Sequence, residues 1–170
     1  MASKINRVTV DLASFPNLIV IYLGMRVNSP KGLRTLLRFG PRIAKSVDEK
    51  PEGLLLHENI IYSLLPLHLG MRQYWRDFDA MEAWARSMPH RSWWQDYVRD
   101  TGGTGFWHET YFMNGGMEAI YDDIPVALGL SQFAPRRRAQ GAMFSARKRA
   151  GVTGEARVPE PVAEQELGEP

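Results

Sequence analysis

The order of strand-like and helix-like segments most limits the folds that this chain can adopt. Leu18–Val27 is dense in β-branched and aromatic residues without clean alternation, which is typical of a strand buried on both faces. Asn28 or Ser29 followed by Pro30 resembles a helix N-cap with Pro at the first helical position, and apolar residues recur at helical spacing as far as Val47. The sequence therefore predicts a buried strand followed by a long helix.

Two more strands and two more helices are predicted next. Leu54–Ser63 and Leu67–Trp75 are strand-like runs separated by a short turn, which favours an antiparallel pair. Asp77 can cap a second helix that ends near Pro89, and a further helix is predicted over His90–Asp100. The middle of the chain thus contributes two strands and then two short helices.

A last strand completes the pattern over Thr104–Met113, ahead of a hairpin turn at residues 114–116 and a candidate returning strand over Met117–Tyr121. Arg7–Leu12 alternates weakly and is a candidate edge strand that Pro16 ends. The main elements run strand, helix, strand, strand, helix, helix, strand. This order predicts an α+β fold of the ferredoxin-like kind, an antiparallel sheet with helices on one face.

Charge divides the chain into three parts. Residues 1–130 hold 14 basic and 14 acidic side chains, residues 131–150 hold six basic and no acidic ones, and residues 151–170 hold one Arg and five Glu. The last stretch has no aromatic residue and buries too little surface to offset its ordering entropy. We expect a folded domain over 1–130, a basic C-terminal segment over 131–150, and a disordered, acidic, Pro/Glu-rich tail over 151–170.

Several classes of protein are excluded by composition. The chain has no Cys, which excludes disulfide scaffolds, thiolate metal sites and Cys nucleophiles. Its longest apolar run is far shorter than the roughly 20 residues of a membrane span, and its first residues are polar, so we expect a cytoplasmic protein without a membrane partner. The Gly-rich stretch at 102–105 lacks the Lys-Ser/Thr of a P-loop, which disfavours nucleotide binding.

His108 is the first candidate for a catalytic residue. Strand alternation places it on one face with Phe106 and Thr110, while Trp107 and Glu109 lie on the other. A neutral imidazole among aromatic side chains can act as an acid, a base or an iron ligand. A structural role, with His108 bonded to a backbone carbonyl, is the alternative.

Arg72 and His90 are the other candidates. Arg72 shares a strand face with His68 and Tyr74, and a guanidinium there can hold a substrate carboxylate or phenolate, or pair with an acid such as Glu109. His90 opens a helix and can be catalytic, a cap or a contact to a partner subunit. None of the four His forms a local ligand motif, so no metal site is predicted.

Five short blocks of the sequence carry a resemblance to a known family. They run in order along the chain and comprise Gly24–Asn28, Tyr74–Phe78, Met81–Ala85, His90–Trp94 and Gly105–Tyr111. Between about Pro16 and Leu130 the chain resembles the monooxygenase-like family of unknown function in the dimeric α/β-barrel superfamily. The resemblance implies a ferredoxin-like subunit, a homodimer with facing sheets, and a cavity between the sheet and the helices.

The resemblance also implies an activity. We expect a monooxygenase-like oxidoreductase that acts on an aromatic or apolar small molecule in this cavity, with Trp107, Phe106 and Tyr74 lining the substrate pocket. In a cofactor-free version His108 accepts a proton from a phenolic substrate and Arg72 stabilises the anion; in a haem version His108 is the axial ligand. Fold analogy does not choose between these chemistries.

Two alternatives remain at this point. The first is a non-catalytic ligand-binding or structural homodimer in which His108 and Arg72 are satisfied structural groups; apolar residues on both sheet faces favour self-association in either case. The second and weaker is nucleic-acid binding through the basic segment Arg136–Arg149, which requires an amphipathic helix there. Because the body of the chain is electrically balanced, nucleic acid is not the expected partner.

Overall fold

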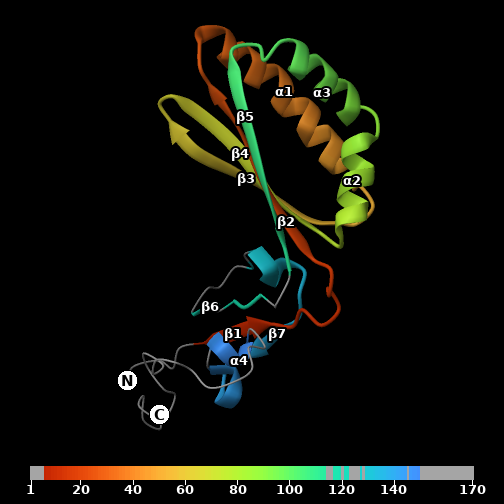
Figure 1. Cartoon of the computed structure of the whole chain (residues 1–170). Helices are drawn as coiled ribbons and strands as arrows, with labels where there is room; N and C mark the ends of the chain where they lie inside the picture. The colour runs from red at the N-terminus through yellow and green to blue at the C-terminus, as the bar shows by residue number, and fades with distance from the viewer. Residues whose placement is uncertain are drawn as a thin grey trace. The chain divides into compact units, whose positions relative to one another are not determined.

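The structure, a computed structural model, describes residues 6–113, 117–119, 121–122, 127, 129–144 and 146–149 (Figure 1). It divides into two compact units. The central unit is Asn17–Phe112, and the terminal unit combines Met1–Pro16 with Met113–Pro170. These units divide the chain at other points than the expected boundary at residue 130, because segments from both ends of the chain pair with each other.

The central unit consists of seven elements in the expected order. They are β2 (Ile19–Val27), α1 (Pro30–Asp48), β3 (Leu54–Leu64), β4 (Leu67–Trp75), α2 (Phe78–Arg86), α3 (His90–Arg99) and β5 (Thr104–Phe112). Pro30 occupies the first turn of α1, and the Asp77 carboxylate accepts a hydrogen bond from the backbone N–H of Ala80 at the start of α2. Ser29 is the N-cap residue of α1 but makes no side-chain capping hydrogen bond, so of the two expected caps only Asp77 caps its helix through its side chain.

The four strands form one antiparallel sheet in the order β3-β4-β2-β5. Each helical connection therefore skips over one strand, as in a split βαβ unit. All three helices lie on the same side of the sheet (Figure 1). The α+β, ferredoxin-like fold expected from the sequence is confirmed.

The strand register gives the sheet two distinct faces. Ile19 lies opposite Trp75, and the Trp75 ring packs 5.3 Å from that of Trp84 in α2, so the side chains in line with this pair face the helices. We name the two sides the helix-covered face and the open face. The helix-covered face carries Ile21, Leu23, Met25, Met71, Gln73, Phe106, His108 and Thr110, and the open face carries Tyr22, Gly24, Gly70, Arg72, Tyr74, Trp107, Glu109 and Tyr111.

The fully buried part of the core lies at one end of the helix-covered face. Leu18 and Trp75 are 0% exposed, and Ile19 and Gln73 are 1% exposed. Farther along β2, the residues that face the helices are only partly buried, although β2 is a central strand. The helix layer is therefore tightly packed on the sheet at the Trp75 end and less so along the rest of β2.

The terminal unit contains a second, three-stranded sheet. Its strands β1 (Arg7–Val10), β6 (Tyr121–Asp122) and β7 (Arg136–Arg138) are arranged in the order β6-β1-β7, and its short helices are η1 (Gly129–Gln132), η2 (Gly141–Phe144) and α4 (Ala146–Arg149). The expectation that residues 117–121 return as a hairpin partner of β5 is wrong, because β6 pairs with β1. The expected edge strand β1 is the middle strand of this sheet.

Over its described residues, 131–144 and 146–149, the basic segment has no long amphipathic helix of the kind that nucleic-acid binding requires. Its three consecutive arginines form β7, and the residues after them form only the short helices η2 and α4. The proposed disordered tail, residues 151–170, lies outside the described residues. Among the described helices, none is both long and apolar enough to cross a membrane.

Candidate active site

The His108 side chain projects from the helix-covered face of β5. It lies opposite Leu23 of β2, with Phe106 opposite Met25 and Thr110 opposite Ile21. The imidazole is exposed and forms no hydrogen bond with a described residue. The nearest described ring is that of Phe106, at 5.9 Å between ring centroids. A polar, accessible group thus sits in the middle of an apolar strand surface.

Aromatic side chains of α3 stand beside this surface. The Trp94 and Tyr97 rings stack on each other at 5.7 Å and contact Phe106 at 5.6 and 5.9 Å. Trp94 is 49% exposed, which is high for a tryptophan that faces its own domain. These rings and the partly buried side chains of Leu23 and Met25 form apolar surroundings for His108, and they remain partly exposed to solvent.

His90 has a different environment at the start of α3. Its Nδ1 donates a hydrogen bond to the carbonyl oxygen of Ala85 at 3.1 Å, which leaves Nε2 with its lone pair. The ring lies 4.6 Å from that of Trp84 and 5.9 Å from that of Trp93, and burial lowers the pKa of His90. His90 is therefore held as a neutral ring between tryptophans, apart from the Phe106–His108 cluster.

A hydrogen-bonded chain that the sequence did not predict also lies on the helix-covered face. Trp75 donates to the Gln73 carbonyl oxygen at 3.2 Å, the Gln73 amide donates to Nδ1 of His57 at 3.1 Å, and Nε2 of His57 donates to Asn59 at 3.2 Å. Burial lowers the pKa of His57, so the neutral ring is the form that this chain holds. The only signal in the sequence was the shared face of Gln73 and Trp75.

Arg72 lies on the open face, where it is paired. Its Nε donates to a Glu58 carboxylate oxygen at 2.7 Å, Nη2 lies 2.6 Å from the same oxygen, and Nη1 donates to the Tyr22 hydroxyl at 3.1 Å. Burial acts to lower the pKa of Arg72, but the hydrogen bonds that Arg72 donates to Tyr22 and Glu58 raise it overall. The acid is Glu58 instead of Glu109 because the register places Glu58 directly opposite Arg72.

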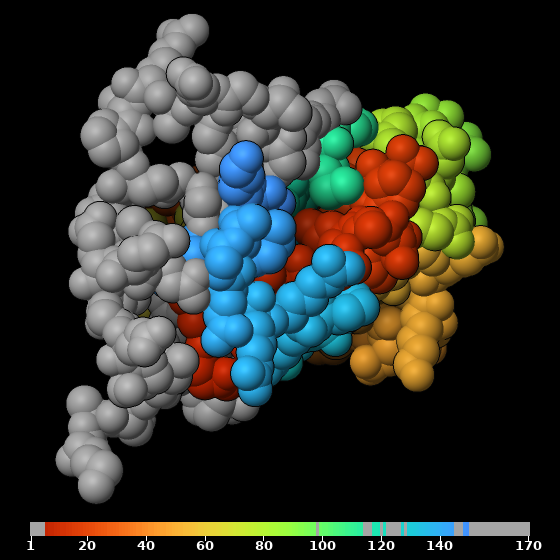
Figure 2. Space-filling model, turned by 90° about the horizontal axis from the view of Figure 1, so that it is seen from below, coloured from red at the N-terminus to blue at the C-terminus, as the bar shows by residue number. Residues whose placement is uncertain are grey.

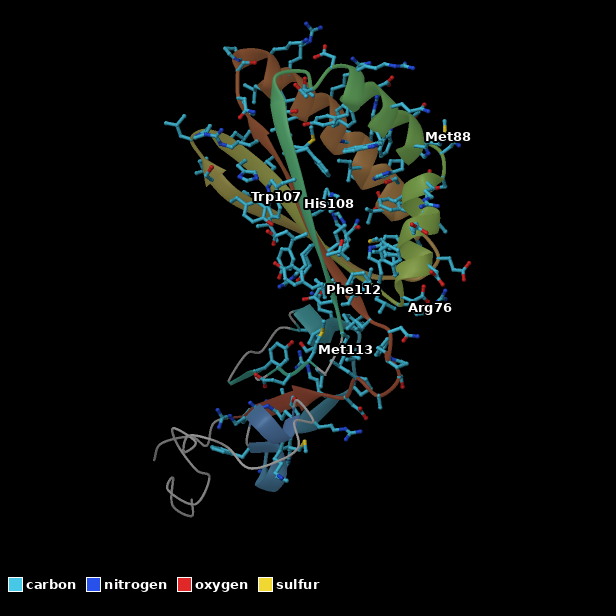
Figure 3. All side chains as sticks on the ribbon, in the orientation of Figure 1. Arg76, Met88, Trp107, His108, Phe112 and Met113 are labelled. Atoms are coloured by element: carbon cyan, nitrogen blue, oxygen red, sulfur yellow. The ribbon has the colours of Figure 1, made fainter. Side chains whose placement is uncertain are left out.

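Tyr74 and Trp107 also lie on the open face. The Trp107 indole N–H donates to Nε2 of His68 at 2.8 Å, and both rings occupy space over Gly24 that a Cβ atom would fill. Figure 3 shows Trp107 and His108 on opposite sides of β5. Of the residues expected to act together, the structure therefore groups His108 with Phe106, and separates both from Arg72, Tyr74 and Trp107.

The separation of Arg72 from His108 corrects the cofactor-free mechanism expected from the sequence. The two side chains leave opposite faces of one sheet, so both cannot contact one small substrate within a subunit. Among the described residues, no group of three or more His, Asp or Glu side chains could hold a metal ion.

Comparisons with known proteins agree with this architecture. A family model described as Monooxygenase af470-like matches residues 18–130. An aldoxime dehydratase solved in complex with butyraldoxime is 22% identical with a TM-score of 0.64, over 87% of this chain and 43% of that one. A second aldoxime dehydratase structure is 21% identical with a TM-score of 0.61, over 78% and 39%.

A third structure is SnoaB from Streptomyces nogalater, described as a cofactor-independent oxygenase. It is 10% identical with a TM-score of 0.41, over 55% of this chain and 90% of that one. No curated protein matches the chain. This chain spans less than half the length of the two aldoxime dehydratases, and at these identities the likeness extends to the fold alone.

Proposed function

Because the chain belongs to the Monooxygenase af470-like family, we propose that it is a small-molecule oxidoreductase that acts on an aromatic or apolar substrate between the helix-covered face and α3. One observation carries this proposal. Leu23, which lies opposite His108, and Met25 are only partly buried although they belong to the central strand β2, and Trp94 of α3 is 49% exposed. A bound apolar molecule would cover them as protein atoms do elsewhere in the core.

In a cofactor-free reaction, His108 is the base. Its exposed imidazole accepts the proton of a phenolic substrate, and a ring carbon of the electron-rich anion forms a bond to O2. Cleavage of the O–O bond then leaves one oxygen atom on that carbon as a quinone carbonyl and releases the other as water, so that the phenol is the reductant and O2 the oxidant. Arg72 takes no part because it faces the other side of the sheet. The polar neighbour on the same face is Thr110, two residues along β5, whose hydroxyl can donate a hydrogen bond to the substrate oxygen.

Haem is the alternative cofactor, and the surroundings of His108 fit its requirements. An iron ligand needs an accessible ring nitrogen in apolar, aromatic surroundings, and His108 next to Phe106, whose ring contacts Trp94, would offer both. When bound, haem would supply redox chemistry at its iron. His108 would hold the group, and the α3 aromatic rings would exclude water from one side.

We also propose that the protein is a homodimer in which the open faces of two sheets meet. Tyr62 is 38% and Tyr111 is 50% exposed on this face, next to the paired Arg72 and Glu58. A second copy would cover these rings and leave the ion pair satisfied within each subunit. Light scattering of the purified chain tests this proposal; a monomer at micromolar concentration would contradict it.

Two measurements test the function itself. The absorption spectrum of the purified protein shows a Soret band if haem is bound. Without one, titration with 4-nitrophenol, whose phenolate absorbs visible light, should show binding and proton transfer to the protein. His108→Ala should abolish the Soret band or the phenolate signal, whereas Glu109→Gln, next along β5 on the open face, should keep it.

The non-catalytic alternative makes the opposite prediction. If His108 is only structural, the wild-type chain binds neither haem nor 4-nitrophenol, or His108→Ala binds them as the wild type does. Either result would overturn the proposed site. The folded state of both variants is checked by circular dichroism, so that loss of binding is not confused with loss of structure.

A further inference from the structure

We propose that the terminal unit holds a second, separate binding site, for a small molecule with an apolar body and a carboxylate head. The site is a cavity of about 330 Å³ between β1, β7 and the C-terminal short helices. Its size is at the small end of the range of ligand pockets in proteins. It does not depend on the proposed function, since every residue that lines it belongs to the terminal unit.

One part of the cavity wall is apolar and adaptable. Met113, Met117 and Met143 all line it, together with aliphatic side chains of the β1 segment. Methionine is unbranched and polarisable, so a wall of three methionines can adjust to an apolar body of variable shape. These methionine and aliphatic side chains carry no charge, so they do not favour a ligand that is charged over its whole length.

The other part of the wall is cationic. Arg137, Lys148 and Arg149 line the cavity, and among the described lining residues Asp11 is the only acidic one. Figure 2 shows the described residues of this basic segment, in blue, at the surface of the molecule. The described lining therefore combines methionine and aliphatic side chains with more basic than acidic groups.

The three cations differ in how far they are already neutralised. Arg137 forms an ion pair with Asp11. Arg149 is only 7% exposed, and donates to Glu118 at 2.9 Å and to the backbone carbonyls of Met143 and Phe144. Both arginines thus act as fixed parts of the wall, and their charges are balanced by carboxylates.

Lys148 is the remaining cation. Its side chain is exposed, and no ion pair or hydrogen bond joins it to any of the described residues. An ammonium group at the edge of an apolar hollow attracts a single anionic head as a point charge. Of the described basic residues that line the cavity, Lys148 is therefore the one available to a ligand, while Arg149 is a fixed part of the wall.

Octanoate is a suitable probe, because it combines an eight-carbon chain with one carboxylate. We expect isothermal titration of the full chain to show saturable binding of octanoate. Octan-1-ol, which has the same chain without the charge, should bind at least tenfold more weakly, since a hydrogen bond to a charged group is stronger than one to a neutral group.

Three variants assign the site. Lys148→Glu and Lys148→Gln should weaken octanoate binding by about tenfold or more. Arg138→Glu is the matched control, because Arg138 is exposed on the same basic segment but does not line the cavity; its affinity should stay within about twofold of the wild type. Both positions are exposed, so the melting temperatures should remain similar.

Several outcomes would overturn the proposal. They are the absence of octanoate binding to the wild type, equal binding of octan-1-ol, and equal weakening by the Lys148 and Arg138 substitutions. If His108→Ala abolishes octanoate binding and Lys148→Glu does not, the ligand occupies the central unit and the proposed site is wrong. Conversely, failure of the His108 experiments leaves the Lys148 result unaffected, so the two proposals fail independently.

Discussion

Arg72 and Trp107 on the open face of the central sheet differ from His108 on the helix-covered face in whether they have protein partners. On the open face, Arg72 is paired with Glu58 and Trp107 donates to His68. On the helix-covered face, Gln73 and His57 are also paired, whereas His108 is exposed and forms no hydrogen bond with a described residue, and most of its neighbours are apolar. Polar groups that already have protein partners stabilise the fold, whereas an accessible imidazole in an apolar setting is available to a ligand.

The glycines of the open face give the largest expected effect. A Cβ atom on Gly70 would collide with the backbone oxygen of Leu23 and with the Tyr62 ring. We therefore expect Gly70→Ala to lower the free energy of unfolding by about 2–4 kcal/mol, since overpacking against backbone is not relieved by a rotamer change. Urea denaturation measures this effect.

Gly105 provides the matched control for Gly70. It also lies in a strand of the sheet, but a Cβ atom there would meet only the side chain of Asn28, at 3.0 Å. That side chain can rotate away, so Gly105→Ala should cost less than about 1 kcal/mol. Equal costs at the two positions would show that the close packing over Gly70 is not needed for the fold.

The ion pair of the open face gives the second effect. Glu58→Ala leaves the Arg72 guanidinium, 29% exposed, with the Tyr22 hydroxyl but without its carboxylate. We expect a loss of about 1–2 kcal/mol in the free energy of unfolding, less than for a fully buried pair because water reaches both groups. Glu82→Ala, whose carboxylate pairs with the largely exposed Arg86, should cost below about 0.5 kcal/mol in the same assay.

The pH dependence of stability tests the two partly buried histidines, His57 on the helix-covered face of the sheet and His90 at the start of α3. Burial lowers the pKa of both His57 and His90 below their ordinary value of 6.5, so below that pH the unfolded chain binds more protons than the folded one. The contribution of the two neutral rings to the free energy of unfolding should therefore be complete above pH 6.5, and it should decrease as the pH drops below that value.

Substitution separates these histidines from the rest of the chain. The His57→Gln and His90→Gln variants should each show a shallower loss of stability between pH 7 and pH 5, and the double variant the shallowest. Asp77 and Asp100, whose pKa values are lowered by hydrogen bonds from Arg76 and Lys31, contribute only at more acidic pH. An unchanged slope in the double variant would contradict the assignment.

Much of the fold could be predicted because its signals are local. Pro30 and Asp77 mark helix starts, and the dense β-branched run around Ile19 marks a central strand. Alternation within one strand also placed Arg72 with Tyr74, and His108 with Phe106, on the same faces. These assignments need only the geometry of neighbouring residues.

The relation between strands could not be read from one sequence. Which face of β4 matches which face of β5 depends on their shared pairing with β2, and a shift of one residue would exchange the faces. The sequence therefore placed Arg72 and His108 in one mechanism, and Glu109 instead of Glu58 beside Arg72. The terminal sheet was missed for a related reason, since β1 and β7 are separated by more than a hundred residues.

The smallest effect concerns two adjacent residues of β5, and it compares the faces most directly. Trp107→Phe keeps the aromatic packing with Tyr62 but removes the donor to His68, so we expect a loss of about 1 kcal/mol. His108→Ala removes an exposed ring with no hydrogen bond to a described residue, and should change the free energy of unfolding by less than about 0.5 kcal/mol. If His108→Ala is the more destabilising of the two, the imidazole is needed for the structure. His108 would then not be a group that is available to a ligand, and the proposed function, which depends on this residue, would fail.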